Sequence, residues 1–185
     1  MAAAESPGPD EELVLAVLAG DENAFAELAR RHKSRVFGLV SRFARNGADL
    51  EDVCQEVFTQ AFLRLRQFRR DSPFEHWLLR IATHKSYDYL RRRRRADETV
   101  SADALFEAGF EPAAPGHAAP SADLEKLHAA LAQLPAQHRL VLTLLCLEER
   151  SLREVSGLTG WSVGSVKVRA FRARLALRKL MEKMR

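Results

Sequence analysis

The chain has 185 residues, of which 46% are hydrophobic and 29% are charged, and its formal net charge is +4. These values are typical of one folded domain or two small ones. They exclude a membrane-spanning chain, because no apolar run approaches the length of a bilayer span. The first residues lack the basic and then apolar layout of a secretion signal. We therefore expect a cytoplasmic protein that makes no membrane contact of its own.

The charge is distributed unevenly along the chain. Residues 1–95 contain 17 Lys and Arg against 14 Asp and Glu, residues 96–122 contain no Lys or Arg and five acids, and residues 123–185 contain 12 against six. Two basic parts therefore flank an acidic one. Basic surfaces at both ends favour a polyanionic partner, most simply a nucleic acid.

Residues 1–10 are small and polar, with Pro and Gly among them, and predict a disordered tail. From Glu11 the apolar residues follow a helical spacing as far as Gly20, which is a typical helix stop. Asp21 or Asn23 can cap the next helix, which runs to the break at residues 46–47.

Residues 49–68 predict a helix with two patterned faces. The apolar face has the three-and-four spacing of a buried stripe and comprises Leu50, Val53, Cys54, Val57, Phe58, Ala61, Phe62, Leu65 and Phe68. A second stripe carries acids, amides and a hydroxyl at Asp52, Gln55, Glu56 and Thr59. Taken alone, this second stripe is equally consistent with an ordinary solvated face and with a docking surface.

The following segment predicts a sharply bounded loop and a basic helix. Ser72 suits the N-cap, Pro73 the first helical position and Glu75 the third position of a capping box. One side of this helix mixes aromatic and basic residues and ends in a run of five arginines, residues 91–95. Such a surface can stack bases and neutralise phosphates. The alternative is a basic helix end that only complements the helix dipole.

Residues 96–122 contain three prolines and no helical or strand period, which predicts an acidic linker. Residues 123–185 then predict four helices. The third opens with a second capping box, Ser151 to Glu154, and stops at about Gly160, and the fourth is capped by Ser162. A short helix, a Gly-containing turn and a longer basic helix are typical of a DNA-binding helix-turn-helix.

The cysteines and histidines do not indicate a metal site. Cys54 and Cys146 fall on apolar helix faces, so we expect two buried thiols rather than a disulfide. His84 and Asp88 lie one helical turn apart and leave a metal-dependent nuclease as an alternative. Two ligands without a third make a poor metal site. We therefore expect no metal, no cofactor and no catalytic residue.

With both halves in view, the chain resembles the compact extracytoplasmic-function (ECF) subfamily of the sigma-seventy family of bacterial RNA polymerase sigma factors. Five runs in order carry the resemblance, which extends from about residue 10 to 181: AGDENAFAELARRH (19–32), EDVCQEVF (51–58), FRRDSPFEHWLLRIATHKSYDYLRRR (68–93), LPAQHRLVLTLL (134–145) and WSVGSVKVRAFRAR (161–174). It implies an all-α protein of two small helical domains. Sigma domain 2 would span residues 11–95 and sigma domain 4 residues 123–185, joined by a flexible acidic linker, residues 96–122.

The resemblance also implies roles for individual residues. The clamp of the largest polymerase subunit would contact Asp52, Gln55, Glu56 and Thr59, and the flap of the second-largest subunit would contact domain 4. In domain 2, Phe68, Ile81 and His84 would hold a base flipped from the melted non-template strand. The neighbouring promoter contacts would be Arg69, Arg70, Arg80, Tyr87, Arg91 and Arg92. In domain 4, double-stranded DNA at the minus-thirty-five element would be contacted by Arg153, Ser165, Lys167, Val168, Phe171, Arg172 and Arg174.

His84 stands where asparagine is common in this family, and Val168 stands where a small polar residue is common. Val168 could present an apolar contact to a thymine methyl group.

The function implied is that of a promoter-specificity subunit, which binds core polymerase, recognises and opens promoter DNA, and performs no chemistry itself. An anti-sigma protein is expected to control it. A conventional dimeric helix-turn-helix regulator that does not bind polymerase is the alternative. That reading leaves the stripe around Asp52 and the aromatic and basic helix unexplained.

Overall fold

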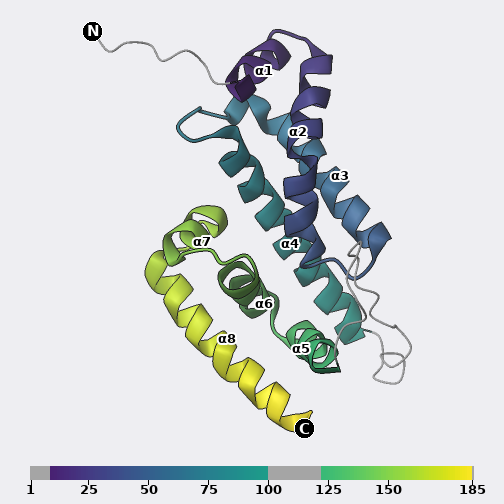
Figure 1. Ribbon diagram of the computed structural model, residues 1–185, viewed down its shortest axis with the longest axis vertical. Coiled ribbons are helices and arrows are strands. Elements are labelled where there is room, and N and C mark those ends of the chain that lie inside the picture. The colour runs from purple at the N-terminus through teal and green to yellow at the C-terminus, as the bar shows by residue number, and fades with distance from the viewer. Residues whose placement is uncertain (1–8, 100–121, 185) are drawn as a thin grey trace.

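The computed structural model describes residues 9–99 and 122–184, and within these ranges every regular element is helical (Figure 1). The N-terminal domain contains α1 (Pro9–Leu18), α2 (Glu22–Ser41), α3 (Gly47–Arg64), a short 3₁₀ turn η1 (Leu65–Gln67) and α4 (Phe74–Thr99). The C-terminal domain contains α5 (Ala122–Gln133), α6 (Ala136–Leu142), a π-helical turn η3 (Thr143–Leu147), α7 (Leu152–Thr159) and α8 (Val163–Lys183). The predicted all-α fold of two helical domains is confirmed.

The N-terminal domain is built from three long helices that contact one another in every pairing, with α1 packed on α2. Its core is continuous from α2 through α3 to α4 and includes Val36, Phe43, Val57 and Leu78, all almost fully buried. Tyr89 of α4 donates a hydrogen bond of 2.8 Å to the Asp49 carboxylate. This bond fixes the start of α3 against the second half of α4.

Polar side chains close in sequence cap the start of four helices. Asp21 caps α2 by accepting from the Asn23 amide at 3.0 Å, and Asn46 caps α3 by accepting from the Asp49 amide at 2.8 Å. Ser162 caps α8 and Ser151 forms the predicted capping box with Glu154. Polar side chains that satisfy the first free amides of a helix are the usual reason for a helix to begin there.

Two helix ends differ from the sequence prediction. Helix α1 begins at Pro9 rather than Glu11, because Asp10 bonds to Arg31 and His32 of α2. Helix α4 continues to Thr99, beyond the predicted linker boundary at residue 95. The tail residues 1–8 and the linker residues 100–121 lie outside the described residues.

The prediction of two buried thiols is half wrong. Cys54 is buried on α3, whereas Cys146 is exposed. Cys146 lies in the π-helical turn η3, where each turn takes in an extra residue. The side chains after Leu144 therefore rotate off the apolar stripe that the α-helical spacing predicted.

The C-terminal domain packs against the N-terminal domain through α4, which contacts both α6 and α7. Helices α6 and α7 lie between α4 and α8 (Figure 1). A second small core joins α5, α6 and α8 through Leu131, Leu134, Leu142 and Ala173. The contact between the two domains is a feature that the sequence did not predict.

Candidate protein-docking and nucleic-acid interfaces

The polar stripe of α3 faces outward, as its spacing predicts. Asp52, Gln55 and Thr59 are exposed, and Glu56 is partly buried. The opposite side of the helix buries Val53, Cys54, Val57 and Ala61 in the core. The fold uses the apolar side except at Phe62, which the spacing placed in the buried stripe but which is 44% exposed. The polar side remains available to a partner.

Glu56 has a second set of contacts inside the domain. Its carboxylate accepts from Lys85 Nζ at 3.2 Å and from Arg92 Nη2 at 3.0 Å, both on α4. Burial alone would raise the pKa of Glu56, but the hydrogen bonds from Lys85 and Arg92 outweigh it, so the pKa is lowered. Glu56 therefore joins α3 to α4, which distinguishes it from the other three residues of the stripe.

The same exposed side of α3 continues into an apolar residue that the sequence analysis did not select. Leu63, one helical turn beyond Thr59, is 69% exposed. Its neighbour Phe62 is also exposed and makes an edge-on contact with Phe25, with ring centroids 5.0 Å apart. An exposed leucine next to polar residues suits a protein contact, although exposed apolar residues are common on protein surfaces. The i+4 spacing from Thr59 was the signal that could have identified it.

The loop between η1 and α4 has a buried anchor and an exposed tip. Phe68, predicted to line a base pocket, is only 6% exposed and packs against Phe74 and Trp77, at centroid distances of 5.7 and 5.3 Å. Arg69 and Arg70 are exposed, and Arg70 has a left-handed backbone with φ 59°. A non-glycine residue held in this conformation often marks a functional loop.

Four of the residues predicted to contact the melted strand lie on α4 at or near its surface. Arg80 and His84 are exposed, and Ile81 and Tyr87 are partly buried. The Arg91 guanidinium lies over the Tyr87 ring at 5.8 Å from its centroid. The structure thus brings basic and aromatic groups together on the one side of α4 where the sequence analysis expects them.

This side of α4 is also where the C-terminal domain lies. The backbone of Leu158 in α7 lies near the His84 ring and acts to raise its pKa, against larger opposing effects. The His84 side chain is exposed in part, but the ring loses enough solvent that desolvation is the largest cause of its lowered pKa, and the charge of Arg80 lowers the pKa further. A neutral imidazole is therefore favoured at this position.

The helix-turn-helix predicted for residues 151–183 is present. Helix α7 ends at Gly160, whose left-handed backbone (φ 75°) makes the tight turn, and α8 starts after Ser162. Trp161 fills the turn, with the Arg169 guanidinium stacked 4.4 Å from its ring centroid. Glycine is favoured here because a side chain would strain the backbone.

Helix α8 presents a basic and partly apolar face to solvent. Its inner side is buried at Val166, Ala170 and Ala173. Lys167, Arg172 and Arg174 are exposed, Val168 is 50% exposed and Phe171 is 69% exposed. Exposed apolar groups among basic ones fit contact with base edges and phosphates together.

The two remaining predicted contacts lie at the margins of this face. Arg153 is exposed on α7. The amide of Ser165 donates to the capping hydroxyl of Ser162 at 3.2 Å, and the two hydroxyl oxygens are 3.1 Å apart. Ser165 therefore takes part in the start of α8.

Within residues 9–99 and 122–184, no group of three or more His, Cys, Asp or Glu side chains is arranged to hold a metal ion. None of the helices in these ranges has the length and apolar character needed to cross a membrane.

Comparisons with known proteins agree with this arrangement. The Sigma-70 region 2 family matches residues 28–96, and the Sigma-70 region 4 family matches residues 124–177. The RNA polymerase sigma-H factor of Pseudomonas aeruginosa is 35% identical over 181 residues, which cover 94% of each chain. The ECF RNA polymerase sigma-E factor of Escherichia coli is 35% identical over 176 residues, 91% of this chain and 92% of the relative.

Solved structures give the same fold. CnrH, in complex with the cytosolic domain of CnrY, is 28% identical with a TM-score of 0.61, and the match covers 94% of this chain and 97% of CnrH. The sigma factor RpoE of Bartonella quintana, in complex with the anti-sigma factor NepR, is 23% identical with a TM-score of 0.58, covering 87% and 98%. The two family matches fall in the two halves of the chain, and the two sequence relatives match it over more than 90% of their own length. The chain therefore belongs to the sigma-70 family of RNA polymerase sigma factors and is related to its ECF members.

Proposed function

We propose that this sigma factor docks on core RNA polymerase through the exposed side of α3, holds the melted promoter strand on α4, and reads duplex DNA upstream with α8. The observation that carries the proposal is the presence in one chain of an outward acidic stripe on α3 and an outward basic face on α8. The stripe suits a basic polymerase surface, and the basic face suits DNA. The polymerase would catalyse RNA synthesis, so the chain would not itself be an enzyme.

The polymerase contact would be made mainly by Asp52, Gln55 and Thr59, with Leu63 as an apolar addition. Glu56 would contribute through its charge while it keeps α3 and α4 together. The clamp of the largest subunit is the expected surface for this side, and the flap of the second-largest subunit is the expected surface for the C-terminal domain.

Control by an anti-sigma protein is also part of the proposal. CnrH was solved with the cytosolic domain of CnrY, and the Bartonella RpoE was solved with its anti-sigma factor. A corresponding protein would bind this chain and compete with polymerase for the surfaces described above.

Asp52→Lys tests the docking side. Asp52 is exposed, so its reversal should leave the fold intact while it weakens binding to core polymerase by about tenfold or more. Glu56→Lys is a less suitable probe, because it would place a third cation beside Lys85 and Arg92. Glu12→Lys on α1, an exposed acid reversed outside the stripe, is the matched control. The affinity of each variant for immobilised core polymerase should fall for Asp52→Lys only. Equal affinities of the two variants would refute the assignment of the α3 stripe to the polymerase contact.

A further inference from the structure

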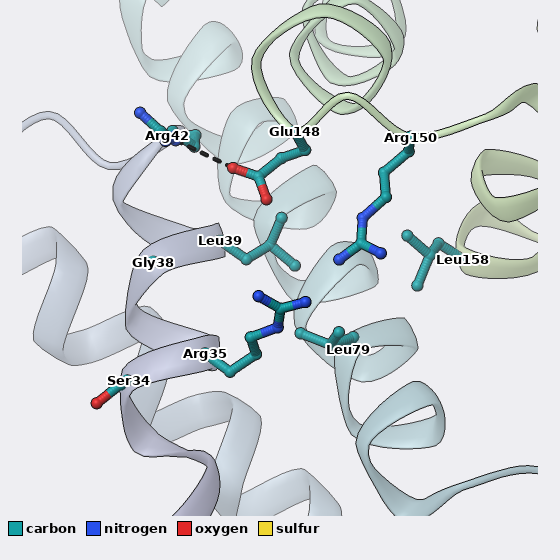
Figure 2. A pocket seen from close by; sticks show the side chains of 9 residues that line it. All are labelled: Ser34, Arg35, Gly38, Leu39, Arg42, Leu79, Glu148, Arg150 and Leu158. Carbon is teal, nitrogen blue, oxygen red and sulfur yellow. Dashed lines mark hydrogen bonds and ion pairs between the residues drawn. The ribbon is translucent and has the colours of Figure 1, made fainter.

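A cavity of about 220 Å³ lies where the two domains meet (Figure 2). It is bounded by α2 and α4 on one side, and by α7 and the segment between η3 and α7 on the other. This volume holds about seven water molecules at roughly 30 Å³ each, or one organic molecule of similar size. The residues that line the cavity include none of those proposed to contact polymerase or DNA, so the proposed function leaves the cavity unexplained.

Part of the cavity lining is apolar. Leu39 of α2 and Leu79 of α4 are buried side chains of the core, and Leu158 of α7 is partly buried against the same core. Water next to such side chains finds no hydrogen-bond partner on them. This part of the lining therefore favours a hydrocarbon group.

Two guanidinium groups extend into the cavity from different domains. Figure 2 shows the side chains of Arg35, from α2, and Arg150, from the segment before α7, extending toward each other. Arg35 Nε is paired with Glu75 at 2.9 Å. Arg150 Nη1 is paired with Glu154 at 3.1 Å, and neither acid lines the cavity. A guanidinium has five N–H donors, so both groups keep donors for an acceptor placed between them.

The lining also contains an acidic side chain, Glu148, which is neutralised by a neighbour. Its carboxylate is paired with Arg42 Nε at 3.0 Å, as the dashed line in Figure 2 marks. Because the positive charge of Arg42 offsets it, Glu148 does little to repel an anion bound at Arg35 and Arg150.

Two residues at the cavity are poorly suited to their backbone positions. Gly38 lies in the interior of α2, where glycine is less stable than alanine, yet an added Cβ would meet no heavy atom within 4 Å. Glu149 lies between the two lining residues 148 and 150 and has a left-handed backbone with φ 51°. Gly38 leaves the cavity its width, and Glu149 turns the chain so that both of its neighbours line the cavity. Residues that are unfavourable for the fold in this way are concentrated at ligand sites.

We propose that the cavity binds a small organic anion, a carboxylate with a short hydrocarbon body. The carboxylate would lie between Arg35 and Arg150, and the hydrocarbon would lie against the three leucines. A planar guanidinium matches the two oxygens of a carboxylate, and a neighbouring apolar surface discriminates such a ligand from inorganic anions. Since Arg35 and Arg150 come from different domains, the bound anion would also link the two domains.

Titration of the full chain with sodium hexanoate, followed by NMR, tests the site. The methyl signals of the three leucines and the amide signals of residues 148–150 should shift together and reach saturation. Hexan-1-ol lacks the charge and inorganic phosphate lacks the hydrocarbon, so each should bind about tenfold or more weakly than hexanoate. Phosphate binding as tight as that of hexanoate would overturn the carboxylate assignment.

A charge variant tests the anion contact. Arg150→Gln should weaken hexanoate binding by about tenfold, because it removes charge-assisted hydrogen bonds to the ligand. Arg30→Gln removes an exposed arginine of α2 outside the cavity and should leave the affinity unchanged. Equal affinities of these two variants would contradict the role of Arg150.

A second variant tests the cavity without removing any contact. Gly38→Met should fill the space and abolish saturable hexanoate binding, while the Tm of the chain stays equal or rises. Gly157→Met makes the same change in the interior of α7, outside the cavity and equally free of neighbours within 4 Å, and should retain binding. Hexanoate binding that persists in Gly38→Met, or shifts that never saturate in the unaltered chain, would overturn the proposal. These measurements omit polymerase and DNA, so their failure is distinct from failure of the proposed function.

Discussion

Arg70 adopts a left-handed backbone conformation in the loop that precedes α4. This conformation costs an L-residue about 1–2 kcal/mol, so arginine is held there against its backbone preference. Glu149, in the segment between η3 and α7, has the same feature with φ 51°. Glycine substitutions at the two residues can therefore be compared to test whether the strained conformation of Arg70 serves DNA binding.

Arg70→Gly and Glu149→Gly should each leave the free energy of unfolding unchanged or raise it by about 0.5 kcal/mol, since relief of strain exceeds the entropy that glycine adds to the unfolded chain. Only Arg70→Gly should weaken binding of polymerase holoenzyme to forked promoter DNA, by about tenfold, because a charge-assisted hydrogen bond contributes about 1.5 kcal/mol. Denaturant titration and fluorescence anisotropy measure the two quantities. Equal DNA affinity for both variants would remove Arg70 from the promoter contacts.

Individual capping residues could be predicted from the sequence because each cap depends on groups only two or three positions away. Asp21, Ser151 and Ser162 accept the hydrogen bonds that their positions predict. The pairing of Glu56 with Lys85 and Arg92 could not be predicted, since it joins residues 29 and 36 positions apart. Likewise, Glu75 bonds to Arg35 of α2 at 2.9 Å, which no local pattern indicates.

At the level of elements, α7 depends on its capping box. The Ser151 hydroxyl accepts from the Glu154 amide at 3.2 Å, and the Glu154 carboxylate accepts from the Ser151 amide at 2.8 Å. The hydrogen bonds from Ser151, followed by that from Arg150, lower the pKa of Glu154 to about 2. The folded pKa thus lies below the ordinary value of 4.5. The stability that Glu154 contributes is present above pH 4.5 and is lost as the pH falls toward 2.

Glu154→Gln should therefore reduce amide exchange protection at residues 154 and 155 at pH 5 and should have a much smaller effect near pH 2. Hydrogen exchange of the variant and of the unaltered chain at each pH measures this loss of protection. Ser151→Ala should have a similar effect, and the double variant should lose little more, because both residues form one box. A loss of protection in Glu154→Gln that is as large near pH 2 as at pH 5 would contradict the role given to the carboxylate.

The helices themselves could be predicted because their apolar spacing and caps agree. The exception is η3, where the helix after Leu142 widens into a π turn and exposes Cys146. Apolar spacing assumes a constant number of residues per turn, so it cannot anticipate a local change in the winding. The residue that follows this turn, Glu148, accepts a hydrogen bond from Arg42 of the N-terminal domain at 3.0 Å.

At the level of the whole molecule, the order of motifs along the chain was sufficient to predict a sigma factor. The family matches over residues 28–96 and 124–177 confirm that prediction. The docking of the C-terminal domain on α4 was not predictable, because it depends on contacts such as Arg139 with Phe43 across 96 residues of sequence.

Run-off transcription with core RNA polymerase on genomic fragments tests the central claim most directly. Adding the chain should produce transcripts from discrete start sites, each preceded by shared minus-ten and minus-thirty-five elements, and Asp52→Lys should reduce their yield in proportion to its weaker binding to core. Transcripts that are identical with and without the chain would contradict the claim that it is the promoter-specificity subunit.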